Sequence, residues 1–167
     1  MINNVVIIGL NYEYNIEIAQ SVAGSLEAYF LDGDEYVNYQ LQNKKNMEEL
    51  CGVEYLKLQE NKAIKGCAEF ENSIITIPSH YFLRDNQYTN FSNSLVIYIR
   101  FSKDKLTKQS KTGFVDEFIV PNLLTYTQKD AELENLAKYT INVRNKKKST
   151  IENEIKMCLE EIYCEHK

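Results

Sequence analysis

The sequence lacks the patterns that mark several classes of protein. No apolar run approaches the length of a membrane span and no signal-peptide pattern opens the chain, so we expect a cytoplasmic protein. The four cysteines form no C-x-x-C pair, and two histidines are too few for a histidine-based metal site. We therefore expect reduced thiols and no bound metal. A net charge of −5 argues against a general nucleic-acid or membrane-surface binder.

The sequence also lacks internal repeats and low-complexity linkers. Its 167 residues suffice for one domain with a real core, and 44% hydrophobic with 26% charged residues is ordinary for a soluble globular protein. We expect a single domain that spans residues 1–167.

What the sequence does contain is an alternation of strand and helix patterns. Apolar and β-branched runs predict strands near residues 4–8, 28–31, 73–77, 94–99 and 139–143. Helical spacing predicts helices over 16–26 and 53–68, a polar helical stretch reaches about residue 50, and Ser149-x-x-Glu152 is typical of a capping box before a last helix. The alternation predicts an α/β fold, a three-layer α/β/α sandwich around a parallel sheet. The strand at 4–8 should lie centrally, because it is apolar on both faces.

The turn after the first predicted strand has the shape of a phosphate-binding loop without its chemistry. A P-loop follows the pattern G-x-x-x-x-G-K-[ST]. Counted from Gly9, the second glycine falls on Tyr14, the lysine on Asn15 and the hydroxyl residue on Ile16. Tyrosine hinders the backbone from curling around phosphate, asparagine carries no neutralising charge, and isoleucine offers Mg²⁺ no oxygen. Only Gly9 matches the pattern.

Acidic side chains add to these losses. Glu13 and Glu17 bring negative charge to the place of a triphosphate, at a helix N-terminus that favours an anion. We expect the 9–17 turn to be filled by Tyr12 or Tyr14 and capped by Glu13 or Glu17. The alternative interpretation is an ordinary strand–turn–helix that never bound phosphate.

Up to about residue 102 the sequence resembles shikimate kinase, a small P-loop kinase. Residues 9–34 fit the family's strand–P-loop–helix–strand–D-x-D spacing without a gap, 53–77 resembles its substrate-domain helix and next strand, and 95–102 resembles the strand before its lid. The resemblance implies a P-loop kinase-like fold, with a substrate-binding-like subregion at about 35–70 and a lid-like region at about 103–128. For an intact member it also implies phosphorylation of shikimate by ATP and Mg²⁺.

The resemblance assigns substrate-site residues position by position. Asp34 matches the aspartate that binds shikimate hydroxyls, and Asp32 matches an acidic residue near Mg²⁺. Lys57 and Lys129 lie where the family has substrate-binding arginines, although a shift of one residue would replace Lys129 by Asp130. An ammonium group grips a carboxylate with less directional precision than a guanidinium group.

The remaining family positions are less well matched. Glu60 matches an acidic residue that the family has three positions after the arginine matched by Lys57, and Pro78-Ser79-His80 replaces a triple-glycine turn. The lid arginine has no clear counterpart. The basic residues nearest to the lid and adenine regions are Lys103, Lys105, Lys108, Lys111, Arg144 and Lys146–Lys148.

These losses favour a shikimate-kinase-like protein with a degenerate ATP site that is not a competent phosphotransferase. No catalytic residue and no cofactor is then expected, and Asp34 with Lys57 and Lys129 would bind a small hydroxylated carboxylic acid. A regulatory or interaction role, with an unknown protein partner, is the other use of such a scaffold. The alternative is a divergent but active shikimate kinase, which would need ATP and Mg²⁺, the metal near Asp32. An interaction module unrelated to metabolites would gain support from an exposed aromatic patch formed by Tyr12, Tyr14, Tyr81 and Phe82.

Overall fold

The predicted parallel sheet is present and its strand boundaries agree with the sequence to within one residue. The computed structural model describes residues 4–110 and 123–165, with side chains placed in 4–106 and 125–162. Within these residues five strands pair in parallel in the order β2-β3-β1-β4-β5. The strands are β1 Asn4–Ile8, β2 Tyr29–Asp32, β3 Ser73–Thr76, β4 Ser94–Arg100 and β5 Tyr139–Asn142. The α/β class is thereby confirmed.

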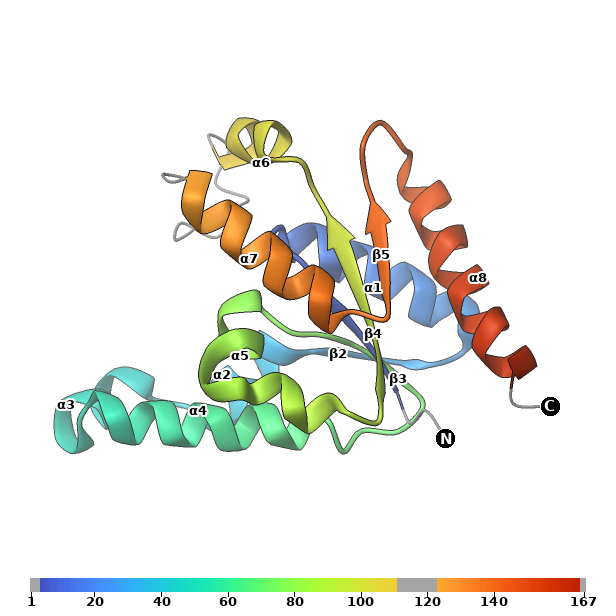
Figure 1. Ribbon diagram of the computed structural model, residues 1–167. Coiled ribbons are helices and arrows are strands. Elements are labelled where there is room, and N and C mark those ends of the chain that lie inside the picture. Colours follow the sequence, from blue (N-terminus) through green and yellow to red (C-terminus); the bar gives the residue numbers. More distant parts are fainter. Residues whose placement is uncertain (1–3, 111–122, 166–167) are drawn as a thin grey trace.

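Helices cover both faces of the sheet (Figure 1). They are α1 Tyr12–Leu26, α2 Gly33–Gln40, α3 Lys44–Cys51, α4 Val53–Cys67, α5 Ser79–Leu83, the 3₁₀ segment η1 Arg84–Phe91, α6 Lys103–Ser110, α7 Leu123–Leu136 and α8 Lys148–Glu165. Helices α1 and α8 pack against each other, whereas α3 and α4 form an arm that projects from the sheet. None of the described helices combines the length and apolar character needed to cross a membrane.

Three sequence-based expectations about helices need correction or lie outside the described residues. Helix α8 begins at Lys148, so Ser149 lies inside its first turn and the predicted capping box is wrong. The polar stretch up to residue 50 divides into two helices, α2 and α3. Of the lid-like region at 103–128, residues 111–122 lie outside the described part of the chain.

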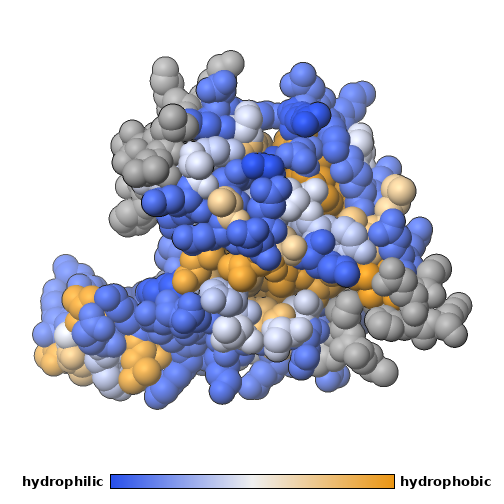
Figure 2. Space-filling model, in the orientation of Figure 1, coloured by the Kyte–Doolittle hydropathy of each residue, from blue (hydrophilic) through white to orange (hydrophobic). Residues whose placement is uncertain are grey.

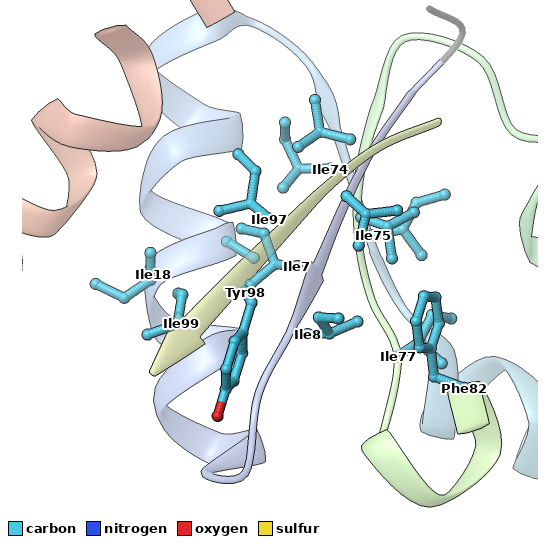
Figure 3. Close-up of a cluster of buried hydrophobic side chains, with 14 of the residues drawn as sticks. Ile7, Ile8, Ile18, Ile74, Ile75, Ile77, Phe82, Ile97, Tyr98 and Ile99 are labelled. Carbon is cyan, nitrogen blue, oxygen red and sulfur yellow. The ribbon is translucent and has the colours of Figure 1, made fainter. Parts of the chain in front are cut away.

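The core is centred on β1, as its apolar sequence predicts. Strand β1 lies between β3 and β4, and all five of its residues are buried. Isoleucines of β1, β3 and β4 interdigitate with Ile18 of α1 on one side and with Phe82 of α5 on the other (Figure 3). Each such side chain contributes about 1.5–3 kcal/mol when it is fully buried. The burial of β1 on both faces therefore agrees with its central place in the sheet.

A charged cluster ties α7 to the end of β4. Asp130 of α7 is 7% exposed and accepts hydrogen bonds from the Tyr98 hydroxyl and from Arg100 Nε, both at 2.8 Å. Arg100 Nη2 binds the second Asp130 oxygen, and Nη1 contacts Glu134 at 3.2 Å. Asp130 thus accepts hydrogen bonds from three donor groups of two side chains, Tyr98 and Arg100.

Gly9 is required by packing at the end of β1. A Cβ atom at this position would lie 2.6 Å from the carbonyl oxygen of Ile99 and 3.0 Å from Asn15 Nδ2. The first distance is far shorter than a van der Waals contact, and a strand carbonyl cannot move without disturbing the sheet. A glycine at this position therefore does not by itself indicate a phosphate site.

We expect Asp130→Ala to lower the free energy of unfolding by about 2–3 kcal/mol, because Tyr98 and Arg100 both lose their acceptor in a mostly buried site. Urea denaturation at neutral pH measures this change. The matched control is Glu134→Ala, which removes only the exposed arm of the same cluster and should cost less than about 1 kcal/mol. Equal effects of the two substitutions would contradict the assignment of Asp130 as the central acceptor.

We expect Gly9→Ala to lower the free energy of unfolding by about 1–3 kcal/mol through overpacking against Ile99. Gly24→Ala in α1 is the control, since a Cβ atom there has no neighbour within 4 Å. Alanine has the higher helix propensity, so the control should raise stability by about 0.5–1 kcal/mol. A neutral Gly9→Ala would show that this glycine is not needed for packing.

Candidate functional site

The candidate site lies at the carboxyl ends of β1, β2 and β3, where ligands bind in parallel α/β sheets. Three segments begin there: the turn 9–11 into α1, Asp32 at the start of α2, and residues 78–80 at the start of α5. Parallel pairing of β1 and β2 with β3 brings these segments to one edge of the sheet. The topology therefore assembles the segments that the sequence singled out.

The turn between β1 and α1 is short and bonded to itself. Helix α1 already begins at Tyr12, and its N-cap is Asn11, whose side chain accepts a hydrogen bond from the Tyr14 N–H at 3.1 Å. The next N–H, that of Asn15, donates to the Asn11 carbonyl at 3.1 Å. The expected cap by Glu13 or Glu17 is therefore wrong. Asn11 caps the helix instead, because asparagine is a preferred N-cap residue and stands directly before the first turn.

Asn15 cross-links the same turn. It is fully buried, and its amide, oriented by its partners, donates to the Asn11 carbonyl and accepts from the Gly9 N–H, each at 3.2 Å. This side chain stands at the position of the P-loop lysine and turns inward. The N–H of Gly9 is thus another backbone donor already engaged by the protein.

Tyr12 projects from the start of α1 to the ends of the neighbouring strands. Its hydroxyl donates to Asp32 Oδ1 at 2.5 Å, lies 3.2 Å from Thr76 Oγ1, and accepts from the Asp34 N–H at 3.2 Å. Burial, followed by the hydrogen bond to Asp32, raises the pKa of the Tyr12 hydroxyl well above its usual range. The phenol is therefore neutral and acts as a fixed donor.

Asp32 serves the protein backbone. It is the N-cap of α2, and its Oδ1 accepts from the N–H groups of Asp34 and Glu35 at 3.0 and 3.2 Å, in addition to the Tyr12 hydroxyl. Three donors on one carboxylate oxygen stabilise the helix start. Asp34 follows in the first turn of α2, half-buried, with Oδ2 accepting from Asn38 Nδ2 at 3.1 Å.

A charged network lies beside Asp34. Glu60 of α4 is 8% exposed and contacts Arg84 Nη1 at 2.8 Å, Lys44 Nζ at 3.4 Å and the Tyr81 hydroxyl at 3.2 Å. Lys44 Nζ also donates to the Tyr81 hydroxyl at 2.9 Å. Burial raises the pKa of Tyr81, and the carboxylates of Glu60 and Asp34 raise it further. Asp34 therefore lies within electrostatic reach of this network.

The network keeps Glu60 ionised. Burial acts to raise the pKa of this carboxyl, but the hydrogen bond from Arg84 and the charges of Lys44 and Arg84 outweigh it, so the pKa is lowered. Lys44 and Arg84 are not among the site residues predicted from the sequence. A signal was present, because Glu60 lies on the apolar face of the predicted 53–68 helix, and a buried carboxylate there needs a cationic partner.

The lysines assigned by resemblance lie outside this network. Lys57 Nζ contacts Glu54 Oε1 at 3.1 Å, one turn away on the exposed side of α4. Lys129 is half-buried on α7 and, among the described residues, makes no ion pair. The structure thus joins Asp34 to Tyr81 electrostatically and shows no direct contact of Asp34 with either lysine. The binding roles of Lys57 and Lys129 stay predictions.

The region that would face adenine is also internally bonded. Lys148 of α8 pairs with Glu17 of α1 and stands over the Tyr14 ring, 5.6 Å from its centre. Tyr14 packs edge-on against Phe101, with ring centres 4.9 Å apart. Lys146 pairs with Glu154 at 2.6 Å.

The aromatic side chains of the site do not form an exposed patch. Tyr81 and Phe82 are 4% and 1% exposed. Tyr12 and Tyr14 are half-buried, and their rings are held by the contacts described above. The structure therefore gives no support to an interaction module built on these four residues.

Comparison with solved structures identifies the fold. The chain superposes on shikimate kinase from Bacteroides thetaiotaomicron with a TM-score of 0.74 and 14% identity, covering 95% of this chain and 98% of that one. For shikimate kinase from Aquifex aeolicus the TM-score is 0.74 at 17% identity, covering 94% and 96%. For shikimate kinase from Acinetobacter baumannii in complex with shikimate it is 0.73 at 13% identity, covering 96% and 94%.

The sequence itself carries little of this likeness. No protein-family model and no curated protein sequence matches the chain. Because the identities are only 13–17% over nearly full-length superpositions, what these proteins share with the chain is the backbone arrangement. The chain therefore has a shikimate kinase-like fold, of the P-loop kinase type.

Proposed function

We propose that this protein is a shikimate-kinase-like protein that has lost phosphotransferase activity and binds a small hydroxylated carboxylic acid. The observation that carries the first part is the self-bonded turn at residues 9–15. A P-loop works because its backbone N–H groups point at phosphate oxygens. Here the N–H groups of Gly9, Tyr14 and Asn15 already have acceptors within the turn.

Charge at the same place opposes a nucleotide. Phosphoryl transfer depends on positioning and on neutralising charge on the phosphoryl group. Asn15 is neutral and turned inward, Glu13 is exposed at the start of α1, and Lys148 is paired with Glu17. The side chain that matches a Mg²⁺ neighbour, Asp32, holds the start of α2 through its Oδ1. Neither ATP nor Mg²⁺ is part of the proposed function.

The second part rests on Asp34 and the network beside it. Asp34 is half-buried and can accept hydrogen bonds from ligand hydroxyls. Lys44 and Arg84 supply two cations, side-chain exposures 27% and 22%, beside the carboxylates of Glu60 and Asp34. One of the solved relatives, from Acinetobacter baumannii, is in complex with shikimate, a ligand that combines hydroxyl groups with a carboxylate. We propose Lys44 as the principal cationic contact, with Lys57 and Lys129 as the contacts predicted from sequence.

We expect no ATP-dependent phosphorylation of shikimate by the purified protein, because the turn offers a triphosphate neither backbone donors nor a lysine. A coupled ADP-release assay with ATP, Mg²⁺ and shikimate measures it, with an intact shikimate kinase as the positive control. Turnover near 1 s⁻¹, roughly the low end for kinases, would overturn the loss of activity. The alternative, a divergent active shikimate kinase, would then hold.

We expect calorimetric titration at low salt to detect shikimate binding that weakens as salt is added, because the attraction is partly electrostatic. Asp34→Asn and Lys44→Ala should each weaken binding about tenfold, the loss of one hydrogen bond to a charged group. Lys57→Ala and Lys129→Ala are the comparison variants. If these weaken binding and Lys44→Ala does not, the cationic contact belongs to them. If no hydroxylated acid binds at millimolar concentration, the binding proposal is wrong.

A further inference from the structure

A second pocket lies at the amino ends of the strands, at the opposite end of the sheet from the candidate site. It encloses about 250 Å³ between the carboxyl-terminal halves of α1 and α8 and the first residues of β1 and β3. In Figure 1 helix α8 extends down to the end of the sheet at which β1 begins. None of the described residues that line this pocket belongs to the Asp34 and Glu60 network, so the pocket is a separate site.

The end of α1 creates the space for this pocket. Helix α1 stops at Leu26, and Glu27 takes a left-handed conformation with a φ of 53°, after which the chain enters β2. Helix α8 packs against α1 and continues to Glu165. Where α1 has ended, the space beside α8 is left as the pocket, with Leu26 at its edge.

The inner wall of the pocket is apolar. Val5, Ile74 and Leu159 line it and are 6%, 2% and 7% exposed. Asn4 and Ser73, one position earlier on each strand, alternate to the other face of the sheet, where both side chains donate to the Phe70 carbonyl. An apolar cavity of about 150 Å³ already accommodates a molecule the size of benzene, and it holds water poorly. The wall therefore suits the apolar part of a small molecule.

Two opposite charges stand at the mouth of the pocket. Lys156, which is half-buried, and Glu160, which is exposed, line it from positions one helical turn apart on α8. Within the described part of the chain neither side chain takes part in an ion pair. Lysine before glutamate is also the weaker orientation of such a pair, so a ligand that engages both charges displaces little. Figure 2 shows apolar and charged residues side by side at the surface near the end of α8.

The end of α1 adds a preference for a cation. The last carbonyl groups of a helix carry partial negative charge, and α1 has no basic residue in its last turn to complement them. An ammonium group of a ligand would meet favourable charge both at this helix end and at Glu160. Lys156 offers its own ammonium group to a carboxylate. The pocket thus combines an apolar interior with places for one cation and one anion.

We propose that this pocket binds a free α-amino acid with an apolar side chain. The ligand side chain packs on Val5, Ile74 and Leu159, its ammonium group lies between Glu160 and the end of α1, and its carboxylate pairs with Lys156. The volume of about 250 Å³ is below the roughly 300–1,000 Å³ of most ligand pockets, which limits the ligand to a molecule of this size. An apolar acid would leave Glu160 unused and an apolar amine would leave Lys156 unused, whereas an amino acid engages both.

Calorimetric titration of the full-length protein with leucine, methionine and phenylalanine tests the proposal. We expect binding at millimolar concentration or below, and no binding of glycine, which lacks the apolar part. N-acetylleucine lacks the ammonium group and leucinamide lacks the carboxylate, so each should bind about tenfold more weakly than leucine. If none of the three amino acids binds at millimolar concentration, or if both derivatives bind as well as leucine, the proposal is wrong.

Substitutions at the mouth locate the site. Lys156→Gln and Glu160→Gln keep the size of each side chain and remove its charge, so each should weaken leucine binding about tenfold. Lys45→Gln is the matched control, because Lys45 and Glu49 have the same order and spacing on α3 and do not line the pocket. Circular dichroism of each variant verifies that it is folded. Unchanged leucine binding in both Lys156→Gln and Glu160→Gln overturns the proposal.

A crossed comparison separates this pocket from the candidate site, since the amino acid proposal does not depend on the binding of a hydroxylated acid. Asp34→Asn and Lys44→Ala should leave leucine binding unchanged, and Lys156→Gln should leave any shikimate binding unchanged. If Asp34→Asn or Lys44→Ala abolishes leucine binding, the amino acid binds at the candidate site and the proposal is wrong.

Discussion

The hydrogen bond between the Tyr12 hydroxyl and Asp32 organises the end of the sheet at which the candidate site lies. It connects the first residue of α1 to the cap of α2, with Thr76 of β3 at the same hydroxyl. The phenol is neutral and partly buried, so the contact is a hydrogen bond from a neutral donor to a carboxylate, and no cationic side chain takes part in it. This contact is compatible with the short turn before α1, with the inward orientation of Asn15 and with the start of α1 at Tyr12.

The fold could be predicted from the sequence because its signals are local and mutually consistent. Residues 5–8 of the first strand are all apolar, and the other strands are apolar or β-branched runs bounded by turn residues, so the sequence pattern located them. The helix starts were less predictable. Ser149 lies in a sequence typical of a capping box, yet α8 starts at Lys148, one residue earlier. Helix ends depend on single hydrogen bonds and shift by a residue or two.

The site could be predicted only in part, because its contacts join segments far apart in the chain. The mismatch between residues 14–16 and the P-loop pattern was readable from residue types. The partners of Glu60 were not: Lys44 and Arg84 lie 16 positions before it and 24 after it. Family positions directed attention to Lys57 instead, whose nearest acidic partner, Glu54, is on its own helix. A family resemblance assigns roles to sequence positions, whereas ion pairs depend on the direction and burial of the side chains at those positions.

The central place of β1 has a consequence for how the chain is made. Val5 pairs with Ile74 and with Leu95, which lie 69 and 90 positions further along (74 − 5 and 95 − 5). During synthesis at roughly 5–20 residues per second, the strand leaves the ribosome several seconds before either neighbour exists. In that interval this β-branched segment, which is apolar on both faces, can bind another unpaired strand or a chaperone. Among the strands of the described sheet, β1 has the longest interval between its own synthesis and that of its partners.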